Sequence, residues 1–334
     1  MRYRTLIAIA VVAAGCSASA KGATTDPATT ATTRPASTST RSITHSTTTV
    51  KRPARAAVDI CAFRGLGTWV DVYDYVPDFA ENGRVAPVKP DAIAAMRSAG
   101  VHTLFLQVAK DDPRSPQTVT NTARAADFLV RAHAAGLRVV AWYLPTHRDP
   151  ALDLERALAL VNFRAAGQRF DGIALDIEGV DAVPNVAERN NRLVALVTAL
   201  DRAAGSLPIG AIVYPPVALD VLNMTLWPSF PYRALAPHID VWLPMAYWTF
   251  RHASSPYRDA SRYISENVVR LRQHIGNPSA PVHVIGGIAD TSSPVDDSGM
   301  VRAGREQRAI GWSLYDFNTT VPSAWPLLRA PAGC

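Results

Sequence analysis

Eight short apolar segments, separated by stretches with helical periodicity, limit the possible fold of this chain more than any other feature. Each segment is a nearly continuous run of aliphatic and aromatic residues, which is typical of parallel strands covered on both faces. The segments are residues 67–73, 101–109, 137–145, 170–178, 208–215, 239–247, 282–290 and 310–317. Amphipathic helical stretches fill most gaps, among them 91–98, 122–135, 149–165, 186–204, 259–275 and 295–308. This alternation predicts an α/β domain built on a parallel sheet.

The number of strand–helix units indicates a closed barrel. Eight units within residues 58–334 match the size of a (β/α)8 TIM barrel. Gly100, Gly136 and Gly205 stand where helices should end, just before a strand or the residues that lead into it. The alternative is an open doubly wound sheet, which normally has a glycine-rich phosphate loop after its first strand. Here the glycine-containing sequence 64–67 precedes the strand, so we predict the TIM barrel.

The first 16 residues have the features of a secretion signal. Arg2 and Arg4 precede the apolar run 6–14, which is too short for a stable transmembrane span. The run ends in Gly15 and Cys16, and this ending resembles a bacterial lipobox, although Ala13 replaces the usual Leu. We therefore expect Cys16 to carry lipid and to anchor the protein at the outer face of the cell membrane. The alternative is an ordinary cleaved signal with an incidental cysteine.

Residues 17–57 are predicted to be a disordered tether. They are rich in Thr, Ser, Ala and Pro and show no apolar periodicity, so they cannot bury enough surface to fold. The whole chain has a net charge of +6. Residues 1–57 contain eight Lys or Arg and one acid, which leaves residues 58–334 near −1. The basic tether suits an anionic membrane or wall polymer, and nothing in the chain predicts nucleic-acid binding by the folded domain.

Three cysteines are present. With Cys16 assigned to lipid, Cys61 and Cys334 remain at the two ends of the predicted barrel, where the first and last strands are neighbours. We predict a disulfide between them, and the alternative is two free thiols. No His/Cys cluster has the spacing of metal ligands, so we expect no metal and no other cofactor.

The fourth apolar segment carries two acids at its end. In a strand, alternate side chains share a face, so Gly172, Ala174, Asp176 and Glu178 point to one side. Two acids on one face lie only about 6–7 Å apart. Their repulsion and burial should raise the pKa of one of them, as a general acid requires. Chemistry in TIM barrels occurs at the C-terminal strand ends, so we predict that this pair is functional.

The other strand ends are acidic and aromatic as well, with no Ser-His or Cys-His arrangement. This composition argues against a catalytic triad and suits glycoside hydrolysis, in which carboxyl groups act between aromatic rings. The predicted substrate-binding residues are Trp69, Asp71, Gln107, Trp142, Tyr214, Met245, Trp248, Asp290 and Asp316. Further polar residues at or just beyond strand ends are Asp74, Lys110 and Tyr315. The alternative for Asp71, Asp290 or Asp316 taken singly is a structural role, and Asp171 is expected to be a structural cap at the opposite end of the barrel.

A long aromatic connection, residues 217–238, joins the fifth and sixth strands. It contains Trp227, Phe230 and Tyr232. Such a connection could form one wall of a sugar-binding cleft, because aromatic rings stack on sugars. The alternative is a hydrophobic cluster under a long loop. The sequence leaves both open.

Two motifs resemble those of family 18 glycoside hydrolases, the chitinases and endo-N-acetylglucosaminidases. Residues 171–178, DGIALDIE, are similar to the strand-four signature DGxDxDxE, with Ala174 in place of the middle Asp. Residues 245–247, MAY, are similar to the strand-six signature, although Trp248 stands where an Asp follows. The resemblance implies that Glu178 is the acid/base, that Asp176 orients an acetamido group of the substrate, and that Tyr247 donates a hydrogen bond to it. The carbonyl of the substrate would then be the nucleophile.

The chain as a whole also resembles secreted actinobacterial lipoproteins described as glycosidases, and the Asp-x-Glu strand end is similar to that of family 25 lysozymes. The sequence therefore favours a monomeric glycoside hydrolase that acts on an extracellular or cell-envelope polysaccharide. A conventional two-carboxylate enzyme, with Asp71, Asp290 or Asp316 as partner of Glu178, remains open. A non-catalytic carbohydrate-binding barrel, favoured by Ala174, remains open too.

Overall fold

The computed structural model describes residues 58–80, 85–331 and 334. The predicted signal peptide with Cys16 and the tether 17–57 lie outside these residues. Within them, no helix combines the length and the apolar character needed to cross a membrane.

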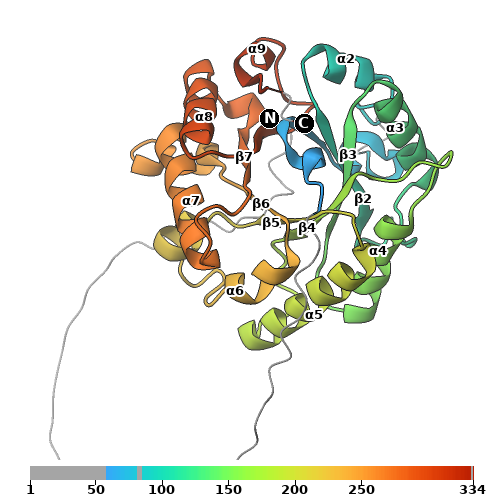
Figure 1. Cartoon of the computed structure of the whole chain (residues 1–334), viewed down its shortest axis with the longest axis horizontal. Coiled ribbons are helices and arrows are strands. Elements are labelled where there is room, and N and C mark those ends of the chain that lie inside the picture. The colour runs from blue at the N-terminus through green and yellow to red at the C-terminus, as the bar shows by residue number, and fades with distance from the viewer. Residues whose placement is uncertain (1–57, 81–84, 332–333) are drawn as a thin grey trace, which may run out of the picture. The chain divides into compact units, whose positions relative to one another are not determined.

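Eight parallel strands form the centre of the domain and confirm the predicted TIM barrel (Figure 1). Their bounds are β1 Gly65–Val70, β2 Thr103–Lys110, β3 Arg138–Leu144, β4 Gly172–Ile177, β5 Ile209–Val213, β6 Val241–Pro244, β7 His283–Ile288 and β8 Gly311–Tyr315. Neighbours in sequence are paired throughout, and β1 pairs with β8. Single bridges from Trp242 to Val282 and from Met245 to Ile285 join β6 to β7 and close the ring.

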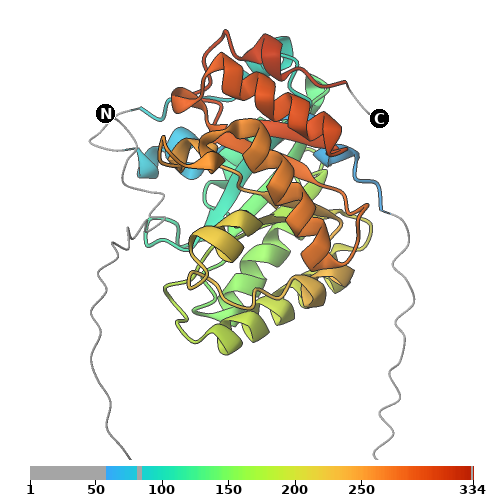
Figure 2. The ribbon, with the colours of Figure 1, turned by 90° about the vertical axis from the view of Figure 1, so that its left-hand side faces the viewer.

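Helices form the outer layer of the barrel (Figure 1). The α-helices are α1 Val72–Tyr75, α2 Ala92–Ser98, α3 Thr122–Ala134, α4 Pro150–Asn162, α5 Val186–Ala204, α6 Tyr232–Leu235, α7 Ala260–Ile275, α8 Pro294–Glu306 and α9 Trp325–Leu328. Side chains predicted by helix-capping rules satisfy the first turns, as with Asn121 before α3 and Asp149 before α4. Figure 2 shows α7 and α8 in front of β7 and β8.

The N-terminal end of the barrel, called the floor here, is filled by Phe63. This residue ends the short 3-10 helix Cys61–Phe63, and its side chain is fully buried. A Cβ added to Gly172 would lie 2.9 Å from the Phe63 ring, and one added to Gly210 would lie 2.7 Å from it. The small residues on β4 and β5 therefore make room for this ring.

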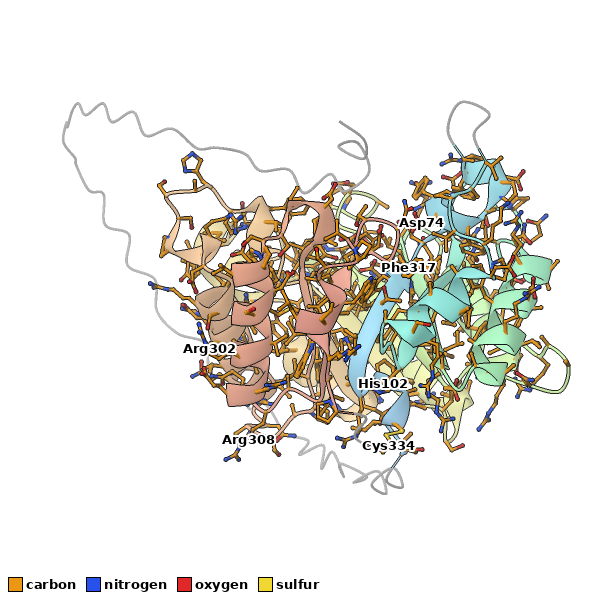
Figure 3. All side chains as sticks on the ribbon, turned by 90° about the horizontal axis from the view of Figure 1, so that it is seen from above. Asp74, His102, Arg302, Arg308, Phe317 and Cys334 are labelled. Atoms are coloured by element: carbon orange, nitrogen blue, oxygen red, sulfur yellow. A yellow bond between two sulfur atoms is a disulfide. The ribbon has the colours of Figure 1, made fainter. Side chains whose placement is uncertain are left out.

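The predicted disulfide between Cys61 and Cys334 is confirmed. The two Cα atoms lie 5.9 Å apart, within the usual range for a disulfide. Figure 3 shows Cys334 and His102 at the floor, and Asp74 and Phe317 at the opposite end of the strands. The bond therefore joins the two ends of the domain at the floor, far from the C-terminal strand ends, which are called the mouth here.

The end of the first strand differs from the prediction. β1 ends at Val70, and the predicted extension to residue 73 is wrong because the chain turns into α1 directly afterwards. The Asp71 side chain accepts hydrogen bonds from the backbone N–H groups of Tyr73 and Asp74. These bonds satisfy donors that a strand would have left unpaired, so they stabilise a helical turn.

The aromatic connection 217–238 packs as a buried cluster. Trp227 is 1% exposed, and its ring centroid lies 5.1 Å from that of Phe230 and 6.3 Å from that of His147. Tyr232 stacks on His274 of α7 at 4.8 Å. These contacts favour the predicted alternative of a hydrophobic cluster under a loop.

Candidate active site

Asp176 and Glu178 lie where β4 ends at the mouth. Asp176 is on the strand, in register with Ile212 of β5, and Glu178 is the first residue after the strand. The Tyr214 hydroxyl donates a hydrogen bond of 3.0 Å to the backbone carbonyl of Glu178. A Cβ on Gly179 would lie 2.8 Å from the Pro145 carbonyl oxygen, so only glycine fits this close approach. These local contacts fix the backbone that carries Glu178.

Both acids of this pair are shifted toward the neutral form. Burial raises the pKa of Glu178 to about 7, and the nearby Lys110 ammonium limits the rise. Burial, followed by the charge of Glu178, raises the pKa of Asp176 well above its usual range. Asp176 is 7% exposed, and its Oδ1 has no hydrogen-bond partner among the described residues. A carboxyl group that stays protonated near neutral pH can donate a proton to a leaving group.

Tyr247 lies between this pair and a second group of acids. It lies three residues after the end of β6, which is shorter than the predicted segment 239–247, and it is 5% exposed. Burial raises the pKa of its hydroxyl well above the usual range, and the charges of Asp176, Glu178, Asp316 and Asp71 raise it further. Its ring centroid lies 6.2 Å from that of Tyr315. Tyr247 therefore stands within electrostatic range of acids from both sides of the mouth.

The second group consists of Asp71, Asp74 and Asp316, from the turns after β1 and β8. The Tyr315 hydroxyl donates a 2.6 Å hydrogen bond to Asp71, and Thr319 donates from its backbone and hydroxyl to Asp316. Burial and the charge of Asp71 raise the pKa of Asp316 to about 6. Burial, Asp71 and Asp316 raise the pKa of Asp74 well above its usual range. These side chains therefore form a compact, strongly coupled acidic cluster.

This cluster could accommodate a cation by its spacing alone. One carboxylate oxygen from each of the three aspartates lies within 4.8 Å of the others. Asp71 and Asp74 also form a reciprocal capping box at the start of α1, which is a structural role. Asp71 thus combines the predicted structural role with a place at the mouth.

Lys110, the last residue of β2, brings a positive charge to the mouth. Its Nζ lies 5.3 Å from the centroid of the Tyr73 ring. Its charge lowers the pKa values of Asp176, Glu178 and Asp71 relative to burial alone. It forms no ion pair with another residue in the described part of the chain, so its charge acts on these acids from a distance.

Other predicted substrate-binding residues lie in the packed interior. Trp69 is 1% exposed, stacks on Phe105 at 4.3 Å and donates to Ser313. Trp248 is fully buried against Gly287. The Gln107 side chain accepts a hydrogen bond from Val72 N–H and thereby holds the start of α1. In this structure these three side chains offer no accessible surface to a sugar.

The remaining predicted residues surround the site more loosely. Trp142 is buried beside Trp69, with its ring centroid at 5.9 Å, and its Nε1 lacks a partner among the described residues. Met245 is buried in the bridge to β7. Asp290 is exposed in the 3-10 helix Ala289–Thr291, where its charge still raises the pKa of Asp316. The structure thus brings together Asp71, Asp176, Glu178, Tyr247 and Asp316.

Asp74, Tyr315 and Lys110 also belong to this site, although the sequence placed them only at or just beyond strand ends and not among the predicted substrate-binding residues. Asp74 lies three residues after Asp71, a spacing that signals a capping box and could have linked the pair. The contact of Tyr315 with Asp71 spans 244 positions, so only the closure of the barrel creates it.

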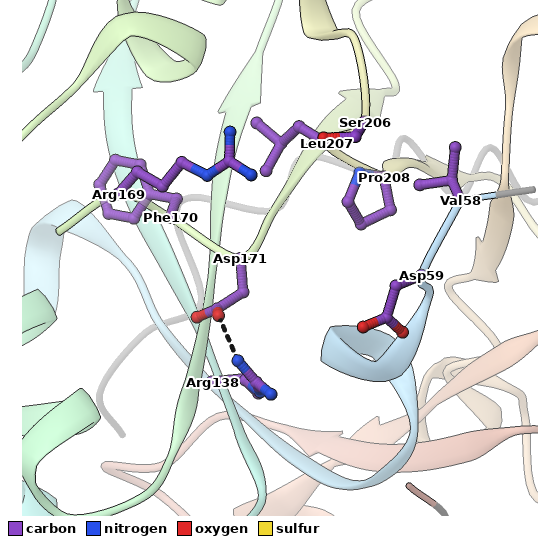
Figure 4. A pocket seen from close by; sticks show the side chains of 9 residues that line it. All are labelled: Val58, Asp59, Arg138, Arg169, Phe170, Asp171, Ser206, Leu207 and Pro208. Carbon is purple, nitrogen blue, oxygen red and sulfur yellow. Dashed lines mark hydrogen bonds and ion pairs between the residues drawn. The ribbon is translucent and has the colours of Figure 1, made fainter. Parts of the chain in front are cut away.

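A pocket of about 420 Å³ opens at the floor, away from these acids. It is lined by Val58, Asp59, Arg138, Arg169, Phe170, Asp171, Ser206, Leu207 and Pro208 (Figure 4). Asp171 accepts hydrogen bonds from Val139 N–H at 2.8 Å and from Arg138 at 2.9 Å, and it pairs with His133. These contacts agree with the structural role expected for Asp171.

No protein-family model and no curated protein matches this chain. Solved structures do match. The spore cortex-lytic enzyme SleL of Bacillus cereus aligns with a TM-score of 0.58 at 11% identity, over 79% of this chain and 73% of its own. The endo-1,4-β-mannanase of Rhizomucor miehei gives 0.57 at 8% identity, over 80% and 93%. Thermotoga maritima Cel5A, solved with mannotriose, gives 0.53 at 14% identity, over 80% and 98%. At these identities the likeness establishes the TIM-barrel fold, and the site described above must carry the functional argument.

Proposed function

We propose that this protein is a glycoside hydrolase that acts on a polysaccharide, with Glu178 as the general acid. The observation that carries the proposal is the Asp176–Glu178 pair at the mouth, where burial raises the pKa of Glu178 to about 7. Cleavage of a glycosidic bond needs a protonated carboxyl group beside the leaving oxygen. Glu178 is protonated in a useful fraction near neutral pH, and it is partly exposed directly after the end of β4.

In the proposed reaction, Glu178 gives its proton to the glycosidic oxygen as the bond to the sugar carbon breaks. The resulting carboxylate then takes a proton from the water that completes hydrolysis. Tyr247 and Asp176 would position the sugar unit that develops positive charge. The nucleophile is either the acetamido carbonyl of the substrate, as the family 18 resemblance implies, or a carboxylate of the Asp71–Asp316 side.

The structural neighbours support this proposal at the level of the class. They are TIM-barrel glycoside hydrolases, named as mannanases, a cellulase-type enzyme solved with mannotriose, and cortex-lytic enzymes. Many chemistries share this fold, so the fold adds to the argument from the site and does not replace it.

A non-catalytic carbohydrate-binding protein is the second candidate. Ala174, fully buried on β4, removes the middle acid that would support Asp176 in the family 18 signature. The intact Glu178 with its raised pKa favours the enzyme. Tight sugar binding without cleavage during long incubation would decide for the binding protein.

We also propose that the protein acts as a monomer at the outer face of the cell membrane. The lipid on Cys16 would hold it there, and the basic segment 17–57 would span from the membrane to the barrel. The substrate would then be an envelope or extracellular polysaccharide.

The test is a hydrolysis screen of the domain from residue 58 onward against envelope glycans and chitooligosaccharides. Glu178→Gln should lower turnover on every active substrate about a thousandfold while preserving binding. Glu155→Gln, an exposed acid on α4, is the matched control and should behave as the parent. Normal hydrolysis by Glu178→Gln would rule out the assignment.

A further inference from the structure

The charges at the mouth are strongly unbalanced. Acids come from the turn after β1, from β4 and from the end of β8, and they act on one another or on Tyr247. They are Asp71, Asp74, Asp176, Glu178 and Asp316, with exposed Asp290 acting on Asp316. The other ionisable groups facing them are Tyr214, Tyr247, Tyr315 and Lys110. Among the described residues, Lys110 is the only base whose charge acts on these acids, while Arg189 acts on Tyr214. The mouth therefore disfavours a second anion and favours a cation.

Asp176 adds a second, independent observation. Its Oδ1 is buried and has no hydrogen-bond partner among the described residues, although buried carboxyl oxygens are normally paired. Asp176 faces the barrel interior, because it alternates along β4 with Gly172, whose added Cβ would lie 2.9 Å from the Phe63 ring. Across the mouth, Tyr315 bonds to Asp71 at 2.6 Å, and its ring centroid lies 6.2 Å from that of Tyr247. A ligand with several N–H donors would satisfy this oxygen, and an ammonium group carries three.

We propose that the mouth binds a polysaccharide of amino sugars whose amino groups are free and protonated, with Asp176 and Asp316 facing the ammonium group. The proposal rests on the glycosidase function above and names its substrate class. A sugar with a free amino group has no acetamido carbonyl, so the nucleophile in this case would be a carboxylate of the Asp71–Asp316 side. A fully N-acetylated sugar carries no charge and gains nothing from the acidic cluster. A uronic acid polymer would face repulsion from the carboxylates, which Lys110 offsets only in part.

The surroundings of Tyr247 explain how the mouth can bind an ammonium group and still keep Glu178 as a proton donor. Tyr247 lies within range of Asp176 and Glu178 on one side and of Asp71 and Asp316 on the other. An ammonium group on the Asp316 side would ionise those acids. Glu178 lies outside the aspartate cluster, and its burial would keep it protonated for the leaving oxygen.

The experiment compares three oligosaccharides of equal length by calorimetry on the domain from residue 58. They are glucosamine, N-acetylglucosamine and galacturonate oligomers. We expect the glucosamine oligomer to bind at least tenfold more tightly than either of the others at pH 6. Its affinity should also fall as salt is raised from 50 to 500 mM, while that of the neutral oligomer stays constant. The salt series needs no variant, so it tests the proposal even if substitutions at the cluster impair folding.

Asp316→Asn should lower the affinity for the glucosamine oligomer roughly tenfold more than it lowers the affinity for the neutral oligomer. Glu155→Gln is again the matched control. Equal or tighter binding of the neutral or acidic oligomer, or binding that does not depend on salt, would overturn the proposal. Hydrolysis of a neutral glycan that depends on Glu178 would leave the glycosidase function standing while this inference fails. Tight binding of the glucosamine oligomer without any cleavage would support this inference and contradict the glycosidase function.

Discussion

Asp171 and Asp176 lie five residues apart around one strand, yet their environments differ in kind. Asp171, at the floor, meets His133, Arg138 and the Val139 N–H group, and these bonds outweigh burial and lower its pKa. Asp176, at the mouth, meets no cation in contact, and burial together with Glu178 raises its pKa. The hydrogen-bond and ion-pair partners of a buried acid, more than its degree of burial, thus decide whether it stabilises the fold or remains available for chemistry.

The largest expected effect comes from a substitution at the mouth. Asp176→Asn should lower turnover about a thousandfold, because the amide cannot ionise or exchange a proton as the carboxyl group that faces the substrate does. The same change should raise the free energy of unfolding by about 1 kcal/mol at pH 7, because a buried, unsatisfied acid is removed. Turnover and urea unfolding of both proteins check this.

The stability gain should depend on pH with a definite sign. The folded-state pKa of Asp176 is raised, so the folded parent binds more protons and loses stability as pH rises above the usual value of 3.8. The gain from Asp176→Asn should therefore vanish near pH 3. If Asp176→Asn instead lowered the free energy of unfolding at pH 7, Asp176 would be a stabilising acid like Asp171, and the difference between the two would be contradicted.

The next largest effect concerns the disulfide at the floor. Replacing both Cys61 and Cys334 by Ser removes a link across 273 positions and should lower the free energy of unfolding by about 3 kcal/mol. Turnover at 20 °C should stay within twofold of the parent, because the bond lies at the end opposite the acids. A loss of turnover without a loss of stability would contradict this separation.

Asp171→Asn should lower the free energy of unfolding by about 2 kcal/mol, because three hydrogen bonds to the carboxylate are weakened. The ion pair with Arg138 adds little to this loss, because the Arg138 side chain is half exposed. The hydrogen bond that protonated His133 donates to Asp171 raises the pKa of His133. The pair therefore stabilises the fold fully below about pH 6.5 and less as pH rises through the folded-state value. The lowered pKa of Asp171 preserves the effect above its usual 3.8.

Unfolding of Asp171→Asn and parent from pH 4 to pH 9 measures this window. The difference should be largest between about pH 4 and pH 6.5 and should shrink toward pH 9. A difference that grows toward pH 9 would show that His133 does not take part.

The smallest expected effect concerns Tyr315→Phe, which removes the 2.6 Å hydrogen bond to Asp71. This bond lowers the pKa of Asp71 against the effect of burial, so its loss should keep Asp71 protonated to higher pH. We expect a change of about 1 kcal/mol in stability and a few-fold fall in turnover. Carboxyl NMR titration of Asp71 in both proteins checks the shift, and an unchanged titration would rule out the role of Tyr315.

The sequence predicted the elements of this fold because its signals are local. Continuous apolar segments, helical periodicity and glycines at helix ends such as Gly100 and Gly136 act within a few residues. The prediction was wrong at the end of β1, because the Asp71 side chain caps a helical turn there, and the apolar pattern of residues 67–73 does not indicate this turn. The cluster of Asp71, Asp74 and Asp316 was also beyond it, because barrel closure brings together residues more than 240 positions apart. Trp69 and Trp248 were chosen as aromatic residues near strand ends, and the sequence does not reveal that packing buries both.

The central claim is that Glu178 is a carboxylic acid held neutral near pH 7 while Asp171 stays ionised. Carboxyl NMR titration of the domain, with Glu178→Gln used to assign the signal, measures both pKa values in one experiment. We expect Glu178 to titrate near pH 7 and Asp171 to titrate below its usual value of 3.8. A Glu178 signal that titrates near its usual value of 4.5 would contradict it.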